Sequence, residues 1–235
     1  MNAAVREDIF LPFLKRLSLL QAQDDDLVRF IVAGSSLVKL SRGETLCEKG
    51  VTPEGVYCLL SGKVKLAVLS FQGNERVVEI IEPGGTFGEP QLFHDEPSPV
   101  HAEALANSEL VFLHKARVRE AARRFPGFAL SLLESMAARV HRMVEDVETC
   151  CLQNAAMRVS NFLVNHAVFD QGTLDGASVE LPACKSVVAS TLNLTPETFS
   201  RELHRLAGEG LVSVDRRTIH IHNLPGLKSA IAECH

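Results

Sequence analysis

The chain has 235 residues, of which 46% are hydrophobic and 23% are charged, and its formal net charge is −5. This length suits two globular domains, and the composition is too apolar for an intrinsically disordered chain. Domains that bind phosphate are usually basic, so the acidic balance argues against a nucleic-acid partner unless a local pattern outweighs it.

The apolar runs, the N-terminus and the cysteines predict where the protein works. The longest apolar runs, such as 56–60, are far shorter than the roughly 20 residues of a transmembrane helix. Residues 1–8 lack a basic segment followed by an apolar core, so no secretory signal is predicted. The cysteines form no CxxC pair, and the adjacent Cys150 and Cys151 cannot form an unstrained disulfide. We therefore expect a cytoplasmic protein with reduced thiols and no membrane partner.

The first half of the chain changes from helical to β periodicity. Residues 9–33 carry apolar side chains at helical spacing, with 24–26 as an N-cap for the second helical piece. From about 36 to 115 short β runs follow, with a glycine at nearly every turn. The runs are 37–40, 55–60, 63–71, 76–81 and 101–114. Many short strands separated by glycine indicate an antiparallel β-roll, that is, a double-stranded jelly roll.

A long helix is predicted to follow the roll. Its apolar residues recur with spacings of 3 and 4, the repeat of a coiled-coil seam, and charged residues such as Arg139 and Arg142 occupy the other positions. This pattern favours a homodimer interface, the alternative being a helix packed on its own domain. The predicted interface residues are Leu130, Leu133, Ala137, Val140, Val144, Val147 and Cys151.

The C-terminal third predicts two helices joined by a short turn, then a hairpin. After a helix over 155–169 and a polar turn, a second helix opens at Pro182. The next helix begins at Thr195 and Pro196, as N-cap and N1 proline. Two short strands then flank 215–217, where arginines stand at the tip of a hairpin. This succession is typical of a winged helix-turn-helix.

The predicted fold class is therefore α+β: an N-terminal antiparallel β-roll, a long dimerisation helix and a C-terminal winged helix-turn-helix. The expected parts are an effector-sensing domain over 1–124, a dimerisation helix over 125–152 and a nucleic-acid-binding domain over 153–235.

Over essentially its whole length this sequence resembles the cAMP receptor protein and fumarate-nitrate reductase regulator (CRP/FNR) family. The order of roll, long helix and winged helix-turn-helix agrees, and Pro196-Glu197-Thr198-Phe199-Ser200-Arg201 resembles the E-x-x-S-R signature of the recognition helix. The resemblance implies a dimeric transcription regulator that binds double-stranded DNA and RNA polymerase under the control of a small-molecule or gaseous effector.

The recognition-helix signature has a direct chemical interpretation. Glu197, Ser200 and Arg201 fall at i, i+3 and i+4, on one face of a helix. Glu197 can accept from cytosine N4, Arg201 can donate two hydrogen bonds to guanine, and Ser200 can approach a thymine methyl. The resemblance implies half-sites like TTGAT and ATCAA about one helical turn apart. The alternative for Glu197 and Arg201 is a surface ion pair. Phosphate contacts are predicted for Lys185, Thr195, Arg205, Arg216 and Arg217.

The effector is less defined. In the cyclic-nucleotide branch, F-G-E and a leucine-phenylalanine pair precede an arginine-serine that holds the cyclic phosphate. The chain has Pro97-Ser98-Pro99-Val100-His101-Ala102 where the arginine-serine should follow, and a buried phosphate without its arginine loses a charged partner. This departure argues against cyclic AMP, although a cyclic-nucleotide-responsive regulator is the alternative function. The predicted effector pocket contains Phe87, Gly88, Glu89, Leu92 and His101.

The cysteines and histidines bear on two possible cofactors, an iron–sulfur cluster and haem. The first cysteine, Cys47, lies inside the roll, so an N-terminal iron–sulfur cluster is not expected. The runs 140–149 and 196–201 are similar to those of dissimilatory nitrate respiration regulators, which implies nitric oxide sensing through haem. Candidate iron ligands are His94, His101, His114 and His141, although no spacing singles one out and no metal site is predicted.

Two further classes of protein compete with a transcription regulator. A jelly-roll enzyme of the cupin type needs histidines and a carboxylate at fixed spacing in its strands, and the sequence lacks that pattern, so no catalytic residues are predicted. A cyclic-nucleotide-binding module without DNA activity conflicts with the intact Glu197, Ser200 and Arg201.

Overall fold

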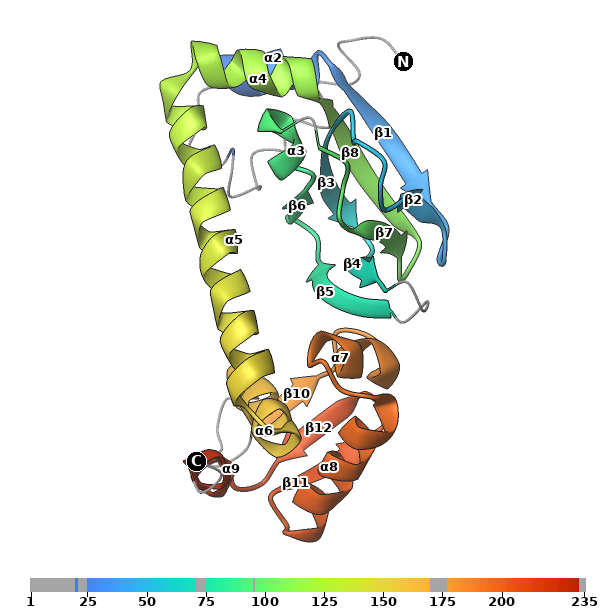
Figure 1. Cartoon of the computed structure of the whole chain (residues 1–235), viewed down its shortest axis with the longest axis vertical. Coiled ribbons are helices and arrows are strands. Elements are labelled where there is room, and N and C mark those ends of the chain that lie inside the picture. The colour runs from blue at the N-terminus through green and yellow to red at the C-terminus, as the bar shows by residue number, and fades with distance from the viewer. Residues whose placement is uncertain (1–19, 21–24, 71–74, 95, 170–176, 233–235) are drawn as a thin grey trace. The chain divides into compact units, whose positions relative to one another are not determined.

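The computed structural model describes residues 20, 25–70, 75–94, 96–169 and 177–232 (Figure 1). The chain divides between Arg142 and Met143 into two compact units. Helix α2 (Asp25–Val32) is the second piece of the predicted helical prelude, whereas 9–19 and 21–24 lie outside the described residues.

The first unit is an antiparallel roll of two four-stranded sheets, in the orders β1-β8-β3-β6 and β2-β7-β4-β5. Three further helices, α3 (Pro90–Phe93), α4 (Lys115–Arg124) and the start of α5 (Pro126–Leu152), belong to it. The strands are β1 (Ser35–Leu40), β2 (Thr45–Cys47), β3 (Gly55–Ser61), β4 (Val64–Leu69), β5 (Glu75–Ile81), β6 (Thr86–Phe87), β7 (His101–Ala104) and β8 (Ser108–His114).

The strand pattern was predicted in outline, with two differences. The run 101–114 is two strands, β7 and β8, because they belong to different sheets. The short strands β2 and β6 were not predicted, since two or three residues carry too little alternation to detect. Gly62 shows why glycines separate the strands: its φ is 90°, and an added Cβ would lie 2.5 Å from the carbonyl oxygen of Asn107.

The roll has two apolar clusters. One lies between the sheets and includes Leu59, Val64 and Leu110, all fully buried. The other joins the helices to the first sheet and includes Ile31 of α2 and Phe128 of α5. Side chains of the strands alternate inward at these clusters, which buries Phe87 of β6, whereas Leu92 is buried from helix α3.

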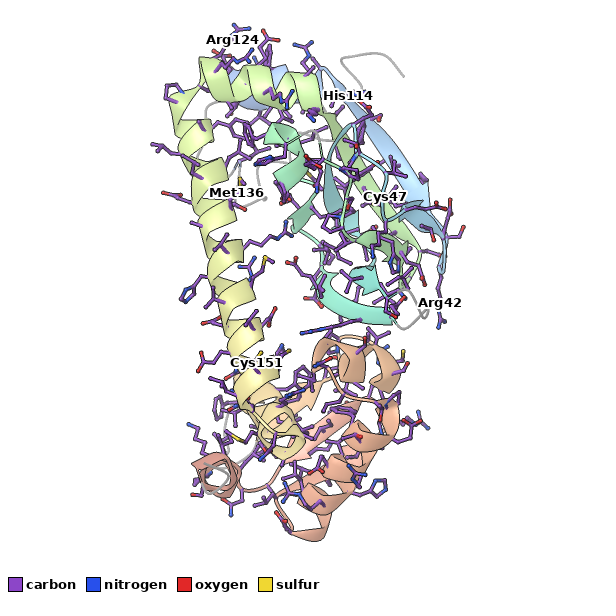
Figure 2. The ribbon with its side chains drawn as sticks, in the orientation of Figure 1. Arg42, Cys47, His114, Arg124, Met136 and Cys151 are labelled. Carbon is purple, nitrogen blue, oxygen red and sulfur yellow. The ribbon has the colours of Figure 1, made fainter. Side chains whose placement is uncertain are left out.

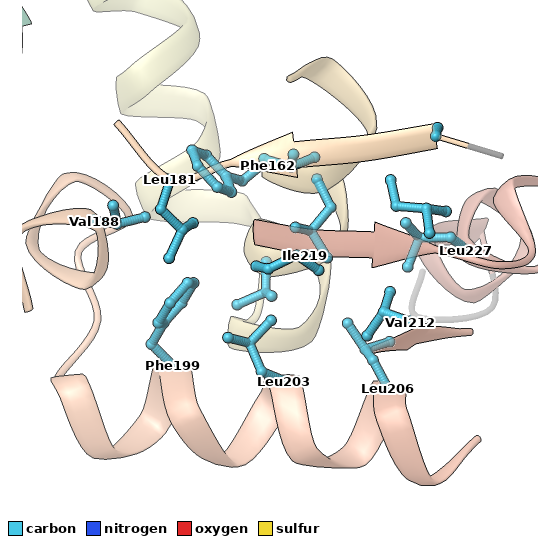
Figure 3. Packing of buried hydrophobic residues seen from close by; sticks show 14 of the residues in the cluster. Phe162, Leu181, Val188, Phe199, Leu203, Leu206, Val212, Ile219 and Leu227 are labelled. Carbon is cyan, nitrogen blue, oxygen red and sulfur yellow. The ribbon is translucent and has the colours of Figure 1, made fainter. Parts of the chain in front are cut away.

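The second unit packs helices on a sheet of order β11-β12-β10-β9. Phe199, Leu203 and Leu206 project from one face of α8 toward Val212, Ile219 and Leu227 (Figure 3). The elements are α6 (Ala155–Asn165), β9 (Val168–Phe169), β10 (Ala177–Glu180), α7 (Lys185–Thr191), α8 (Pro196–Gly208), β11 (Val212–Asp215), β12 (Thr218–Ile221) and α9 (Leu224–Ala232).

The predicted α+β class and the order of roll, long helix and winged helix-turn-helix are confirmed, and two boundaries were wrong. The helix predicted over 155–169 ends at Asn165, because Val168 and Phe169 pair with β10 as a strand. Pro182 lies before α7, which begins at Lys185 after Cys184 as N-cap. The predicted turn over 170–176 lies outside the described residues.

One arginine ties several segments of the second unit together. The guanidinium of Arg158 donates to the carbonyl oxygens of Gln153 at 3.0 Å and Cys150 at 2.8 Å. It also donates to the carbonyls of Leu192 and Asn193, at 3.3 and 3.1 Å. Arg158 thus connects the end of α5 to the turn between α7 and α8.

Candidate functional site

Helix α8 presents one apolar face to its domain and one polar face to solvent. Thr195 caps the helix, its hydroxyl accepting from the backbone N–H of Thr198 at 3.2 Å, and Pro196 follows at the first helical position, as predicted. Phe199 is fully buried, whereas Glu197 and Arg201 are exposed on the opposite side. The bare face therefore carries one carboxylate and one guanidinium, one turn apart.

The first turn of α8 stabilises the charged form of Glu197. Its own backbone N–H and then the Thr195 side chain lower the pKa of the Glu197 carboxyl below its ordinary value. Arg201 lies 3.9 Å from Glu202 and has a side-chain exposure of 72%, so the ion pair that it makes is with Glu202 rather than with Glu197. Both groups are open to a partner.

The residues predicted to contact phosphate are not equivalent. Arg205 pairs with Glu202 and Glu209, at 3.0 and 2.6 Å, and Arg217 donates to the carbonyl of Leu181 at 2.9 Å. Arg205 is thus engaged by acidic residues of its own helix and its C-cap, and Arg217 joins the turn of the hairpin to the residue after β10. The other three lie elsewhere on the surface: Lys185 at the start of α7, Thr195 at the cap of α8, and Arg216 at the hairpin tip with a φ of 52°.

The predicted seam of α5 is bare. Leu130, Leu133, Val140, Val144 and Val147 are between 60% and 62% exposed. Ala137 is also exposed, as is Cys151 near the end of α5 (Figure 2). This stripe does not pack on the described part of its own chain, and the dimer interface stays a prediction.

A cavity of about 450 Å³ lies in the first unit between the roll and α5. Segment 79–86 and Glu89 form one wall, and residues between Ser131 and Arg142 of α5 form the other. Four glutamates and two arginines line it: Glu79, Glu82, Glu89, Glu134, Arg139 and Arg142.

Arg139 joins the two walls of this cavity. Its guanidinium donates to Glu89 at 2.9 Å, to Glu79 at 2.8 Å and to the carbonyl of Thr86 at 3.2 Å. Glu89 also accepts from the Thr86 hydroxyl, and its side chain is only 4% exposed. Burial lowers the pKa of Arg139, but Glu89 and Glu79 raise it by more, so the net shift is upward. The buried carboxylate is thereby compensated.

The structure does not bring the predicted effector residues together. Only Glu89 of that set lines the cavity. Phe87 and Leu92 belong to the apolar clusters, and Gly88, with a φ of 97°, makes room for the nearby carbonyl of Gly55. The sequence did not predict Arg139 and Glu79 as residues of this cavity. Arg139 contacts Glu89 and Glu79, which are 50 and 60 residues away in the chain, and no local sequence pattern indicates such contacts.

His101 belongs to a separate polar cluster on the second sheet. Its Nε2 is 3.2 Å from Glu75, and Lys65 lies between the carboxylates of Glu75 and Glu103, at 2.7 and 3.1 Å. The carboxylates of Glu75 and Glu103 and the imidazole of His101 are close enough to one another to hold a metal ion, but the Lys65 ammonium already provides the cation. The cluster therefore stabilises the sheet.

Two family models match the chain. The cyclic nucleotide-binding domain matches residues 37–125, and the Crp-like helix-turn-helix domain matches residues 157–230. Together with the bare polar face of α8, these matches define a DNA-binding transcription regulator with an effector-binding domain, and not an enzyme. The two matched domains are those of CRP/FNR regulators, whose members bind DNA and act as dimers.

Curated relatives agree with this assignment. The chain is 26% identical over 185 residues to the global nitrogen regulator of Synechocystis, covering 77% of this chain and 82% of the relative. It is 27% identical over 180 residues to the cyclic AMP receptor protein of Thermus thermophilus, covering 77% and 81%. Membership of the dissimilatory nitrate respiration subgroup stays a prediction.

Solved structures share the fold. FixK2 from Bradyrhizobium japonicum superposes with a TM-score of 0.70 at 22% identity, covering 83% of this chain and 96% of that one. A transcriptional regulator of the CRP/FNR family from Thermus thermophilus gives 0.65 at 21%, covering 85% and 100%. The described helices include no candidate for a bilayer-spanning segment.

Proposed function

We propose that this protein is a cytoplasmic homodimer whose two α8 helices read a palindromic site like TTGAT-N4-ATCAA. The observation that carries the proposal is the bare face of α8, where Glu197 and Arg201 stand opposite the buried Phe199. Glu197 accepts from cytosine N4, Arg201 donates to guanine, and Ser200 lies on the flank between them and the domain.

The exposed stripe of α5 supports the dimer. A row of aliphatic side chains, each about three-fifths exposed, is unusual on a soluble surface, and its 3,4 spacing suits a parallel partner helix. Two copies of the chain around a two-fold axis bring two recognition helices to the two halves of a palindrome. RNA polymerase is the further partner that this role implies.

The cavity beside Arg139 is the effector site that we propose. Its walls belong to the roll and to α5, so a ligand that enters it competes directly for the Arg139 contacts. Only a difference in the ligand's affinity for two arrangements of those walls can shift the regulator between them. The four glutamates make the site a poor match for a cyclic phosphate, so the cyclic-nucleotide alternative has the weaker support.

The described residues do not fit haem. A haem needs an axial ligand at the edge of a cavity that shields the macrocycle, and none of the histidines lines the cavity. His101 is held by Glu75, His94 is exposed, and His114 stands exposed at the end of β8 (Figure 2). Charged side chains also line the cavity. No step of the proposed function depends on haem or on nitric oxide.

Fluorescence anisotropy of a labelled TTGAT-N4-ATCAA duplex tests the proposal. We expect the full chain to bind this duplex much more tightly than a scrambled one, because base contacts add to the phosphate contacts that both duplexes share. Anaerobic titrations with haem, and with haem plus nitric oxide, test the subgroup prediction separately. Equal affinity for both duplexes contradicts the proposed readout.

A further inference from the structure

A groove of about 470 Å³ runs along one flank of α8. Ser200, Leu203, His204 and Ala207 of α8 form one wall, residues 212–214 of β11 form the other, and Lys185 of α7 stands beside them. His204 is exposed on the rim of this groove, between its floor and the bare face that carries Arg201.

DNA geometry places phosphates along this flank. The major groove is about 12 Å wide and an α-helix with its side chains is about 10–12 Å across, so a seated helix has a phosphate backbone on each side. Besides Ser200, which is predicted to approach a base, the flank with the groove offers the ammonium of Lys185 and the hydroxyl of Ser213. These groups are of the kind that bind phosphate oxygens.

The orientation of the His204 ring determines what it offers to a phosphate. Its Nδ1 lies 2.8 Å from the carbonyl oxygen of Ser200. Because a carbonyl only accepts, Nδ1 carries the proton, and in the neutral ring Nε2 then has a lone pair and no proton. A phosphate oxygen also only accepts, so neutral His204 has nothing to donate to it. The imidazolium donates from both nitrogens at once.

We propose that His204 takes up one proton from solvent when α8 binds DNA, and that its Nε2–H then donates to a backbone phosphate at the rim of the groove. DNA affinity therefore rises as the pH falls through the range in which histidines become charged. The inference rests on the proposed function of α8 and adds a phosphate-contacting residue and a proton linkage to it.

The charges around His204 couple the proton to the DNA. Among the described residues that line the groove, Lys185 and His204 are the titratable ones. Arg201 lies three residues earlier on α8, and across the groove His222 bonds through Nε2 to the Ser213 hydroxyl at 2.8 Å. A phosphate bound at the rim favours the charged imidazole over the neutral one, so protonation accompanies binding.

His166 provides a matched control within the same domain. Its Nδ1 lies 2.9 Å from the carbonyl of Phe162, four residues earlier, as the His204 Nδ1 does with Ser200. His166 follows α6, away from the residues that line the groove. A substitution there removes the same ring and the same local hydrogen bond without touching the proposed phosphate contact.

The test is anisotropy with the full chain on the TTGAT-N4-ATCAA duplex and on a scrambled duplex, at pH 6 and pH 8 and constant ionic strength. We expect tighter binding at pH 6 on both duplexes, by about tenfold for each of the two α8 helices of the dimer, in line with one added hydrogen bond to a charged group per helix. His204→Gln loses most of this difference between the two pH values, whereas His166→Gln keeps it. His204→Arg restores tight binding at pH 8, because a guanidinium donates at both pH values.

Calorimetry in two buffers of different ionisation enthalpy measures the proton directly. The wild type and His166→Gln should take up a proton on binding that His204→Gln does not. The same pH dependence in His204→Gln and wild type overturns the inference and leaves the proposed readout intact. If the wild type shows no preference for the palindromic duplex, the proposed base readout is contradicted instead. The scrambled duplex still tests His204 in that case, since phosphate contacts do not depend on sequence.

Discussion

Helices α5 and α8 each bury one face and leave another bare, but the two bare faces differ in chemistry. On α5 the bare residues are aliphatic, with Val140, Val144 and Val147 about three-fifths exposed. On α8 they are Glu197 and Arg201, with the apolar residues inside. An apolar stripe packs against another apolar stripe, whereas a polar face can form hydrogen bonds with base edges. Each helix therefore indicates the class of its own partner.

The inward faces differ in the same way. Phe199 and Leu206 fill an apolar core behind α8, whereas α5 directs Arg139 at the buried Glu89. In the proposed function the exposed charges of α8, Glu197 and Arg201, serve a partner, while the inward charge of α5 serves the fold and the proposed effector site. The predictions below separate these uses of charge.

The largest effect is expected for Val140→Glu. The substitution places two glutamates in one seam of the dimer, and each unpaired charge there costs about 3–5 kcal/mol. We expect a monomer in sedimentation equilibrium. His141→Glu, at the next position and outside the seam, should remain dimeric, and a dimeric Val140→Glu protein places the interface elsewhere.

A stability loss of about 3–5 kcal/mol is expected for Arg139→Met, because Glu89 is left buried without its cation. Urea unfolding followed by tyrosine fluorescence measures it, since Tyr57 in β3 is the only tyrosine and the chain has no tryptophan. Adding Glu89→Gln should restore most of the stability. Lys39→Ala, which breaks the exposed pair with Glu109, should change it by less than about 1 kcal/mol. Equal losses of unfolding free energy for Arg139→Met and Lys39→Ala would mean that burial does not determine how much an ion pair contributes to stability.

The smallest effect is expected for Arg201→Ala, on DNA alone. Discrimination at the guanine of the half-site should fall by about 1–3 kcal/mol, while affinity for a scrambled duplex falls much less and the urea midpoint stays constant. Anisotropy on the two duplexes gives both numbers. Equal losses on specific and scrambled duplexes would assign Arg201 to phosphate instead of guanine.

The sequence predicted the parts of this protein that depend on local pattern. Thr195 and Pro196 marked the start of α8, the glycines marked the turns of the roll, and the 3,4 spacing marked the stripe of α5. The cavity was not predicted, because Arg139 and Glu89 meet only through the fold. The end of α6 was missed since Val168 and Phe169 continue its apolar pattern but pair with β10.

The contacts of Arg158 also have a mechanical consequence. Its planar guanidinium donates hydrogen bonds both to the last turn of α5 and to carbonyls in the turn that precedes α8. A rotation or slide of the last turn of α5 therefore carries Leu192 and Asn193 with it, unless these hydrogen bonds break. The last turn of α5 is therefore coupled to the recognition helix by side-chain hydrogen bonds, in addition to the covalent path through α6 and α7.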